Sequence, residues 1–100
     1  LTWRNTMSCV VIADFYIKEG KGQEFSNWAN KDIFPGTRTY DGNVSIEAYT
    51  NLDDEDQITF YEEWESREHH EVYIEFRKTD GTMEYIEKMS ASAPSIRYFE

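Results

Sequence analysis

The pattern of hydrophobic and polar residues predicts a strand that runs straight into a helix in the second half of the chain. From Ile58 to Trp64, the residues are β-branched or aromatic with two glutamates among them, as in a half-buried strand. Ser66 then has the side chain of a helix N-cap. The following helix, predicted over residues 67–78, carries a stripe at spacing i, i+3, i+4 and i+7 that should turn inward. This stripe consists of His69, Val72, Tyr73 and Phe76.

The side chains of the strand point alternately to its two faces, and those on one face lie in the same interior as the stripe of the helix. Successive side chains of a strand point to opposite faces, so Ile58, Phe60, Glu62 and Trp64 lie on one face. Glu62 is the one carboxylate on this otherwise apolar face. His70 lies about 100° further round the helix than its neighbour and is expected to face solvent or the rim. The shared interior should therefore contain Glu62, Trp64, His69 and Tyr73.

The other elements follow from the same patterns. They are a central strand over Cys9–Ile17, a helix from Phe25 that ends at Pro35–Gly36, a turn over residues 40–43, a strand over Val44–Tyr49, a short helix around residues 83–89 and a last strand over residues 95–99. The order strand, helix, strand, strand, helix, strand predicts the α+β class. We expect a ferredoxin-like βαββαβ fold with an antiparallel four-stranded sheet and helices on one face. Residues 1–6 are expected to be an N-terminal leader, and residues 7–100 a single domain.

The second face of such a sheet has no helix to cover it. That face carries Tyr61 and, by alternation, Val10, Ile12 and Tyr49. An uncovered apolar face of this kind favours association with another copy of the chain. We therefore expect a homodimer in which two sheets meet.

Charge and cysteine usage narrow the classes of partner. Twenty acidic residues against ten Lys and Arg give a formal charge of −10, which disfavours nucleic acid and anionic membrane as partners. The single cysteine, Cys9, cannot form an internal disulfide. Together with the lack of a signal peptide or a long apolar run, this predicts a cytoplasmic protein. Two adjacent histidines on one helix do not converge on an ion, so no metal is expected.

Each candidate site residue has a structural and a functional interpretation. Trp64 is either a core aromatic or a pocket wall that stacks on a flat ring. His69 is either a neutral, hydrogen-bonded core residue or a general base. Glu62 either pairs with a cation or a backbone amide, or is buried without one and then has a raised pKa and could act as acid or base. Tyr73 either has a satisfied hydroxyl or donates a hydrogen bond to a substrate oxygen.

Several short motifs resemble those of the antibiotic biosynthesis monooxygenase (ABM) family. They are Gly20 with Phe25, Gly42-Asn43, Asp53-Asp54, Glu62-Glu63-x-Trp-x-Ser-x-Glu and Ile96-Arg-Tyr-Phe99. The likeness runs from about Met7 to the end and is strongest to a bacterial branch whose members mostly have no assigned substrate. It implies a homodimer in which two sheets form an α+β barrel, with a pocket between each sheet and its helices. Relatives include cofactor-free oxygenases of phenols or anthrones, haem-degrading enzymes and an isomerase.

The resemblance carries over only in part. Trp64 matches the tryptophan of the family's pocket. Relatives often have histidine where this chain has Tyr73, and cofactor-free oxygenases commonly have asparagine where it has Phe60. Haem degraders have asparagine where it has Ala13. These departures concern the chemistry and leave the predicted fold unchanged.

The sequence thus predicts a cofactor-independent monooxygenase that oxidises a small phenolic, quinol or enolic molecule. The expected catalytic residues are His69, Glu62 and Tyr73, and the expected substrate-binding residues are Trp64, Phe60 and Phe76. No cofactor is expected. The alternatives are a non-oxidative isomerase that uses the same base and a non-catalytic small-ligand-binding dimer of the same fold.

Overall fold

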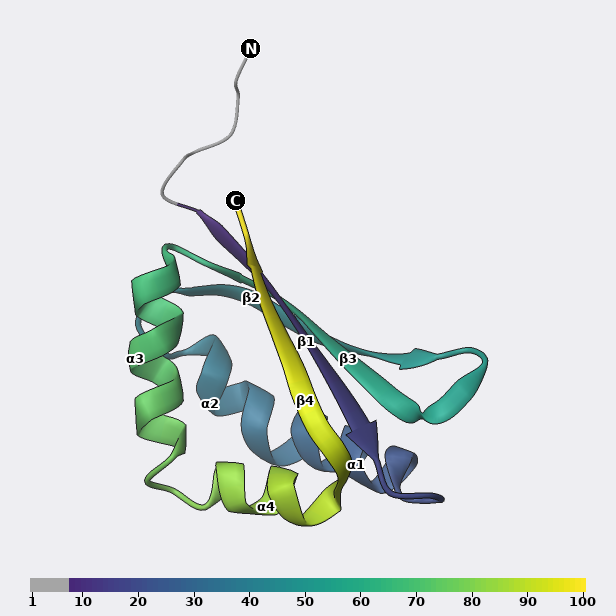
Figure 1. Cartoon of the computed structure of the whole chain (residues 1–100). Coiled ribbons are helices and arrows are strands. Elements are labelled where there is room, and N and C mark those ends of the chain that lie inside the picture. Colours follow the sequence, from purple (N-terminus) through teal and green to yellow (C-terminus); the bar gives the residue numbers. More distant parts are fainter. Residues whose placement is uncertain (1–7) are drawn as a thin grey trace.

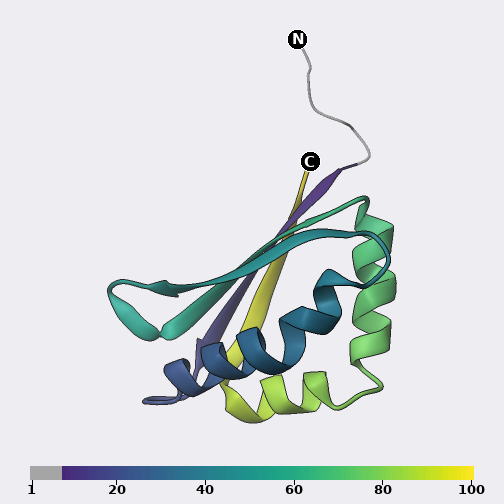
Figure 2. The ribbon, with the colours of Figure 1, turned by 180° about the vertical axis from the view of Figure 1, so that it is seen from behind.

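An antiparallel sheet forms one layer of the molecule, and the helices of residues 8–100 cover one of its faces (Figures 1 and 2). The computed structural model describes residues 8–100, and the leader predicted over residues 1–6 lies outside them. In chain order, the elements are β1 (Cys9–Ile17), α1 (Gly22–Trp28), the π-helix η1 (Ala29–Ile33), α2 (Phe34–Arg38), β2 (Asn43–Asn51), β3 (Asp54–Trp64), α3 (Arg67–Arg77), α4 (Thr82–Met89) and β4 (Ser90–Phe99). The strands lie in the order β2-β3-β1-β4, and every neighbouring pair is antiparallel. The predicted ferredoxin-like βαββαβ fold is confirmed.

Strand β3 has the alternation that its sequence predicts. Ile58, Phe60, Glu62 and Trp64 are all buried on the face that the helices cover. Ser66 is the N-cap of α3, as predicted, and its hydroxyl oxygen accepts a hydrogen bond from the backbone N–H of His69 at 3.1 Å. This bond satisfies one of the N–H groups that a helix leaves free in its first turn. Strand and helix are thus joined by a two-residue connection, which holds Glu62 close to α3.

The first helical segment does not end at Pro35–Gly36, so that prediction is wrong. The chain widens into the π-helix η1, where the backbone N–H of Phe34 bonds to the carbonyl of Ala29, and then continues as α2. Pro35 explains the widening, because proline has no N–H to donate and its ring crowds the carbonyl four residues before it. Proline is well tolerated in the first turn of a helix, so α2 can begin there. The result places Ile33 and Thr37 over the interior.

The last strand begins at Ser90, directly after α4, and not at Ser95 as predicted. Pro94 therefore lies within a strand. It is tolerated there because β4 is an edge strand paired only with β1, so a missing N–H need not break a ladder on the outer side. The register between the two strands shifts near this point, between Asp14 and Tyr16.

Two groups of buried hydrophobic residues lie between the sheet and the helices. The larger contains Phe15, Phe25, Phe34 and Phe60, and it joins the sheet to the segment from α1 to α2 and to α4. The smaller joins the upper part of the sheet to α3 and consists of Cys9, Val11, Trp64 and Tyr73. Figure 2 shows the helices gathered on one side of the sheet. The candidate site lies where these two groups meet.

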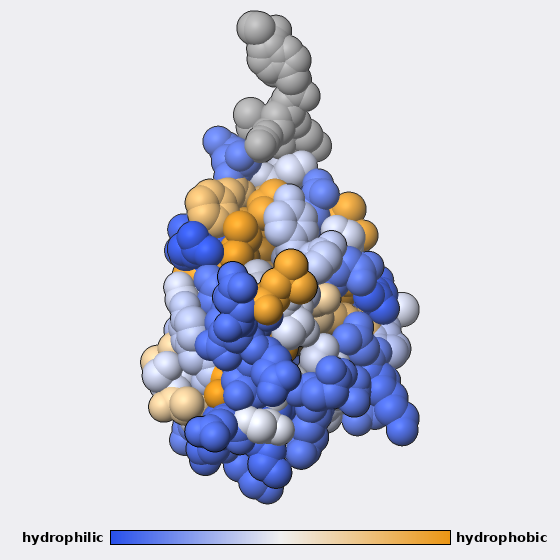
Figure 3. Space-filling view, turned by 90° about the vertical axis from the view of Figure 1, so that its right-hand side faces the viewer, coloured by the Kyte–Doolittle hydropathy of each residue, from blue (hydrophilic) through white to orange (hydrophobic). Residues whose placement is uncertain are grey.

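The outer face of the sheet is partly apolar. Tyr61 and Phe99 are 46% and 44% exposed, and their cross-strand neighbours Ile12 and Val10 are half-buried. Figure 3 shows hydrophobic side chains gathered in the upper half of the side that faces away from α3. Within residues 8–100, no helix combines the length and the apolar composition that crossing a bilayer requires.

Candidate functional site

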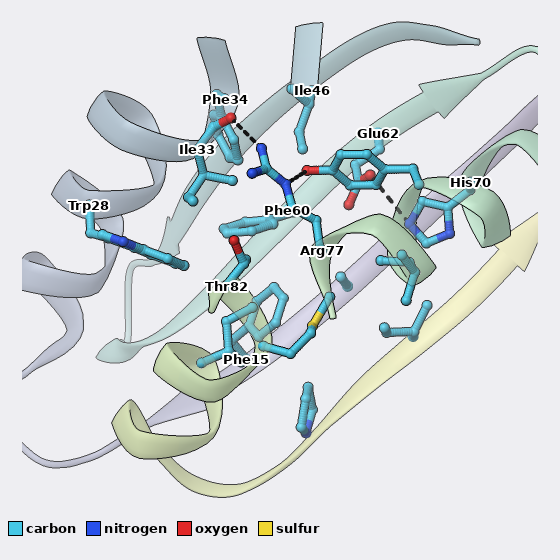
Figure 4. A pocket seen from close by; sticks show the side chains of 17 residues that line it. Phe15, Trp28, Ile33, Phe34, Ile46, Phe60, Glu62, His70, Arg77 and Thr82 are labelled. Atoms are coloured by element: carbon cyan, nitrogen blue, oxygen red, sulfur yellow. Dashed lines mark hydrogen bonds and ion pairs between the residues drawn. The ribbon is translucent and has the colours of Figure 1, made fainter. Parts of the chain in front are cut away.

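A cavity of about 80 Å³ lies between the sheet and the helices α2, α3 and α4 (Figure 4). Most of its wall is apolar and includes Phe15, Ile33, Phe60, Ile74, Met83, Ile86 and Ile96. The polar side chains in its wall are Glu62, His70, Tyr73, Arg77 and Thr82. They form two ends, one around Glu62 and His70 and one around Tyr73 and Arg77. We name these the acidic end and the cationic end.

At the acidic end, Glu62 is a buried carboxyl group with few partners. It is 4% exposed, and its Oε1 accepts a hydrogen bond from Trp64 Nε1 at 2.8 Å. Within the described part of the chain, no Lys or Arg lies within ion-pair distance of it. Burial raises the pKa of Glu62 to about 7, although the bond from Trp64 acts in the opposite direction. A carboxyl group with such a pKa exchanges its proton near neutral pH.

His70 is the nearest basic group to Glu62. Its Nε2 lies 3.6 Å from Glu62 Oε1, and its Nδ1 lies 2.8 Å from the hydroxyl oxygen of Tyr98. The side chain is 2% exposed. Burial lowers the pKa of His70 to about 4, because removal from water disfavours the charged imidazolium. Near neutral pH, Glu62 therefore faces an uncharged imidazole.

At the cationic end, Arg77 is buried and fully engaged. Its Nε donates to the Tyr73 hydroxyl at 2.8 Å, and its Nη1 donates to Asp80 at 2.7 Å. Its Nη2 donates to the Ile33 carbonyl at 2.9 Å. Thr37 in turn lies 2.6 Å from the Tyr73 hydroxyl and donates to the same Ile33 carbonyl at 3.1 Å. These bonds fix the guanidinium in place and keep its positive charge.

Three of the predicted site residues line the cavity: Glu62, Tyr73 and Phe60. Trp64 does not form the predicted wall, because it is fully buried behind Glu62, with its ring 4.9 Å from the Tyr73 ring. It acts on the cavity through its hydrogen bond to Glu62. The Tyr73 ring faces the cavity, but its hydroxyl points into the chain of bonds with Arg77 and Thr37, so it is not free to donate to a substrate.

The predicted positions of His69 and Phe76 are wrong. His69 lies outside the cavity, in a surface depression with Tyr40 and Asp41, where its ring contacts the backbone of Gly42. Its Nδ1 pairs with the Ser66 hydroxyl at 2.7 Å. Phe76 is 41% exposed and stacks on Tyr40. Neither side chain belongs to the wall of the cavity.

The reason for this correction is that α3 is rotated by one residue from the predicted orientation. Its buried residues are His70, Tyr73 and Arg77, while Val72 is 56% exposed. These three positions have the spacing i, i+3, i+7 of a helix face. Hydropathy does not reveal this face, because histidine and arginine are polar residues. Each of the three is accommodated inside because it has a polar partner: His70 pairs with groups on β3 and β4, Tyr73 with Thr37 of α2, and Arg77 with the Ile33 carbonyl of η1.

Tyr98 is a further residue of the site, which the sequence indicated only as part of the motif Ile96-Arg-Tyr-Phe99. It belongs to β4, its hydroxyl meets His70, and its ring lies 4.2 Å beneath the Arg67 guanidinium. It is half-buried and borders a surface groove, so it reaches from the acidic end to the outside. Its cross-strand neighbour Val11 is apolar, so the strand pairing did not indicate a polar role for Tyr98.

The arrangement is suited to acid–base chemistry on a small, mostly apolar molecule. An ionisable carboxyl group faces an apolar space, and a fixed positive charge belongs to the wall of the same space. Among residues 8–100, no three His, Cys, Asp or Glu side chains converge as metal ligands would.

Comparisons with known proteins agree with this architecture. A conserved protein from Methanosarcina mazei Go1 is similar in structure, with a TM-score of 0.75 and 21% identity over 94% of this chain and 92% of that chain. A protein from Nitrosomonas europaea that is named after the antibiotic biosynthesis monooxygenases has a TM-score of 0.77 and 15% identity over 98% and 93% of the two chains. Rv0793 from Mycobacterium tuberculosis has a TM-score of 0.70 and 20% identity over 93% of each chain. At these identities the likeness concerns the fold.

A comparison with curated proteins finds no match. The model of one family, described as antibiotic biosynthesis monooxygenase, matches residues 8–81. This segment contains β1 to α3, and with them Glu62, His70 and Arg77. The chain therefore belongs to the antibiotic biosynthesis monooxygenase (ABM) family.

Proposed function

We propose that this protein is a cofactor-independent monooxygenase that oxidises a small phenolic, quinol or enolic molecule, with Glu62 as the general base. The observation that carries the proposal is a buried carboxyl group in the wall of an apolar cavity, with a pKa raised to about 7. A general base is most effective when its pKa lies near the working pH. His69, the other candidate base of the sequence, lies outside the cavity and is left out of the mechanism.

The cavity favours a neutral, flat and small substrate. Its wall is apolar apart from the two ends, and a charged molecule would lose its hydration there without full compensation. A volume of about 80 Å³ is smaller than the roughly 150 Å³ of an engineered cavity that holds benzene. A ring can therefore enter only if side chains move. Met83 is suited to this, because a methionine side chain adapts its shape easily.

The chemistry begins with proton transfer from the substrate to the Glu62 carboxylate. The resulting anion is a strong electron donor, and it passes one electron to dioxygen. The two radicals then combine to form a C–O bond and a peroxide anion, which takes back the proton from Glu62. Loss of the second proton at that carbon, with cleavage of the O–O bond, leaves a carbonyl group and water. One oxygen atom of dioxygen ends in the product and the other in water.

The fixed charge of Arg77 supports the anion. It lines the same cavity as Glu62 (Figure 4), and a positive charge in an apolar site stabilises a developing negative charge more strongly than it would in water. Its own bonds to Tyr73 and Asp80 hold it in place, so it does not move toward the substrate during the reaction.

Oxygen consumption tests the proposal directly. Purified metal-free protein should consume oxygen with a member of a panel of hydroquinones and anthrones, and the rate should rise with pH through about 7 as Glu62 loses its proton. Glu62→Gln keeps the shape and should lower the turnover number by about 10² to 10⁴-fold. His69→Gln is the matched control and should have the wild-type rate. Glu62→Gln at the wild-type rate would refute the assignment of the base.

The same experiment distinguishes the alternatives. Substrate loss without oxygen uptake would identify an isomerase that uses the same base. Binding of a panel member without conversion would identify a small-ligand-binding protein. Turnover that requires added haem or flavin would contradict the cofactor-independent mechanism.

We further propose that the protein is a homodimer in the cytoplasm. The apolar part of the outer sheet face, around Ile12 and Tyr61, supports sheet-to-sheet association. The chain's one cysteine is a buried free thiol, which suits a reducing compartment. Ile12→Lys should shift the mass measured by light scattering to that of a monomer. A wild-type protein that is monomeric at micromolar concentration would contradict the dimer.

A further inference from the structure

A buried base has to lose its own proton to solvent before it can accept one from a substrate. Glu62 is 4% exposed, so bulk water does not reach its carboxyl group directly. The proton of its protonated form must therefore leave through groups that both accept and donate a proton. The part of the chain around the cavity offers two routes, one at each end.

The route at the cationic end is closed. From Tyr73 it runs through the Thr37 hydroxyl to the Ile33 carbonyl. A carbonyl oxygen accepts a hydrogen bond but has no proton to pass on. Arg77, which donates to Tyr73, cannot accept a proton because it stays charged. The cationic end therefore keeps a positive charge but does not transfer protons.

The route at the acidic end leads to the surface. Glu62 Oε1 lies 3.6 Å from His70 Nε2, and His70 Nδ1 lies 2.8 Å from the Tyr98 hydroxyl. Tyr98 borders a surface groove whose wall also contains Glu68, Glu71 and Glu75. The geometry points to a proton relay from Glu62 through His70 and Tyr98 to the carboxylates of this groove. The relay rests on the proposed role of Glu62 as base.

The distance of 3.6 Å between Glu62 and His70 is about half an ångström longer than a good hydrogen bond. A small rotation of the carboxyl group closes it, since Oε1 is held only by the hydrogen bond from Trp64. The second link, 2.8 Å long, is already a hydrogen bond. The relay therefore needs one small movement in the step from Glu62 to His70.

The transfer leaves His70 uncharged before and after. The protonated Glu62 carboxyl group gives its proton to Nε2, Nδ1 gives its own proton to the Tyr98 oxygen, and the Tyr98 hydroxyl gives its proton to water or a carboxylate in the groove. Glu62 ends as a carboxylate, and His70 ends in its other neutral tautomer. When Glu62 takes up a proton from solvent, the same steps run in reverse and return His70 to its first tautomer.

The surroundings of His70 favour the neutral form throughout. Burial opposes a charge on the ring and sets its pKa to about 4, while Glu71 acts weakly in the other direction. The titratable or charged groups that face the relay are Glu62 on β3, Tyr73, Glu71 and Arg67 on α3, Tyr98 on β4 and Cys9 on β1. Because the ring stays uncharged near neutral pH, a switch of tautomer is the accessible way to move a proton.

Two measurements that need no substrate test the relay. In protein with ¹⁵N-labelled histidine, NMR should show His70 changing from the Nδ1–H to the Nε2–H tautomer as Glu62 loses its proton, and Glu62→Gln should abolish the change. In Tyr98→Phe, exchange of the His70 ring proton with water should become several-fold slower, because the path to the surface is cut. A purely structural hydroxyl predicts the opposite, since loss of a hydrogen bond exposes the ring proton and speeds its exchange.

The controls are matched. Tyr40→Phe removes a hydroxyl from another half-buried tyrosine, which packs against Tyr73 and Phe76, and it should leave the exchange rate unchanged. The His69 ring provides an internal reference on the same helix. A His70 that keeps one tautomer while Glu62 titrates, or an exchange rate in Tyr98→Phe at or above that of the wild type, overturns the relay.

Turnover gives an independent test. With a quinol that the wild-type protein oxidises, a stopped-flow jump from a pH below the Glu62 midpoint to one above it should start turnover after a several-fold longer lag in Tyr98→Phe than in the wild type, because Glu62 must first lose its proton through His70 and Tyr98. Equal lags overturn the relay. If no quinol is oxidised, the proposed function fails, while the tautomer and exchange measurements still decide whether the path exists.

Discussion

The two ends of the cavity both bury an ionisable side chain, but they treat it differently. Arg77 donates to Tyr73, Asp80, Ile33 and Thr37, so its charge is compensated on every side. Glu62 accepts a hydrogen bond from Trp64 and faces a neutral histidine, so its charge is poorly compensated. Arg77 therefore keeps its positive charge, whereas Glu62 can gain and lose its proton. This difference is why we assign the cationic end to positioning and the acidic end to proton transfer.

The largest expected effect is on stability, at the cationic end. Arg77→Met removes the four hydrogen bonds that the buried cation donates to Tyr73, Asp80, Ile33 and Thr37, which should lower the free energy of unfolding by about 3–5 kcal/mol, since each contributes about 1 kcal/mol. Lys78→Met is the matched control, because its pair with Glu75 is exposed and such pairs contribute about 0–1 kcal/mol. Urea unfolding measures both. Equal losses would show that Arg77 is not the structural charge that we describe.

The second effect is on the pH dependence of stability, at the acidic end. The pKa of Glu62 is raised from 4.5 to about 7, so the native state keeps a proton that the unfolded state has lost, and the stability contribution falls as pH rises through this range. The pKa of His70 is lowered from 6.5 to about 4, so its contribution falls as pH drops through that range. Each contribution amounts to roughly 3 kcal/mol.

The two variants should therefore show opposite trends. Relative to the wild type, Glu62→Gln should gain stability as pH rises from 4.5 to 7, and His70→Gln should gain stability as pH falls from 6.5 to 4. Unfolding in urea at several pH values between 4 and 8 measures the trends. A constant difference from the wild type at every pH would mean that the two groups titrate normally.

A smaller effect is expected at Trp64. Trp64→Phe keeps most of the buried ring but removes the N–H that bonds to Glu62, which should cost about 1–3 kcal/mol of stability. The same bond lowers the pKa of Glu62, so its loss should move the pH midpoint of turnover upward. A midpoint that moves downward would contradict the role we give to this tryptophan.

The smallest effect is expected at His69. It lies at the surface, and although its ring nitrogen pairs with Ser66, the Ser66 cap also binds the backbone N–H of residue 69. His69→Gln should change the free energy of unfolding by less than about 0.5 kcal/mol. A loss comparable to that of His70→Gln at neutral pH would mean that the two histidines are not as different as their positions imply.

The fold could be predicted from the sequence because its signals are local and mutually consistent. Alternation in Ile58–Trp64 and the cap at Ser66 fixed both the buried face of β3 and the start of α3. Glu62 was identified for the same reason, since strand parity alone places it inward. The π-helix before Pro35 was missed, because a proline signals a break in the hydrogen bonds of a helix but not whether the helix resumes after it.

The face of α3 could not be predicted in this way. The apolar residues Val72 and Phe76 suggested one face, yet the helix buries His70 and Arg77. What decides the rotation is the set of polar partners on other elements: Glu62, Tyr98 and Thr37. These partners lie close only after folding, so hydropathy along a single helix does not contain the information.

The central claim is that Glu62 exchanges its proton near neutral pH, and its pKa can be measured without a substrate. In protein labelled with ¹³C at the glutamate side-chain carboxyl carbon, the one signal lost in Glu62→Gln belongs to Glu62, and its chemical shift should titrate with a midpoint near 7. The reference is the pKa of about 4.3 that a glutamate side chain has in a model peptide. A Glu62 midpoint at or below that value would contradict the account, because an ionised, well-compensated carboxylate would be a structural group and a poor base.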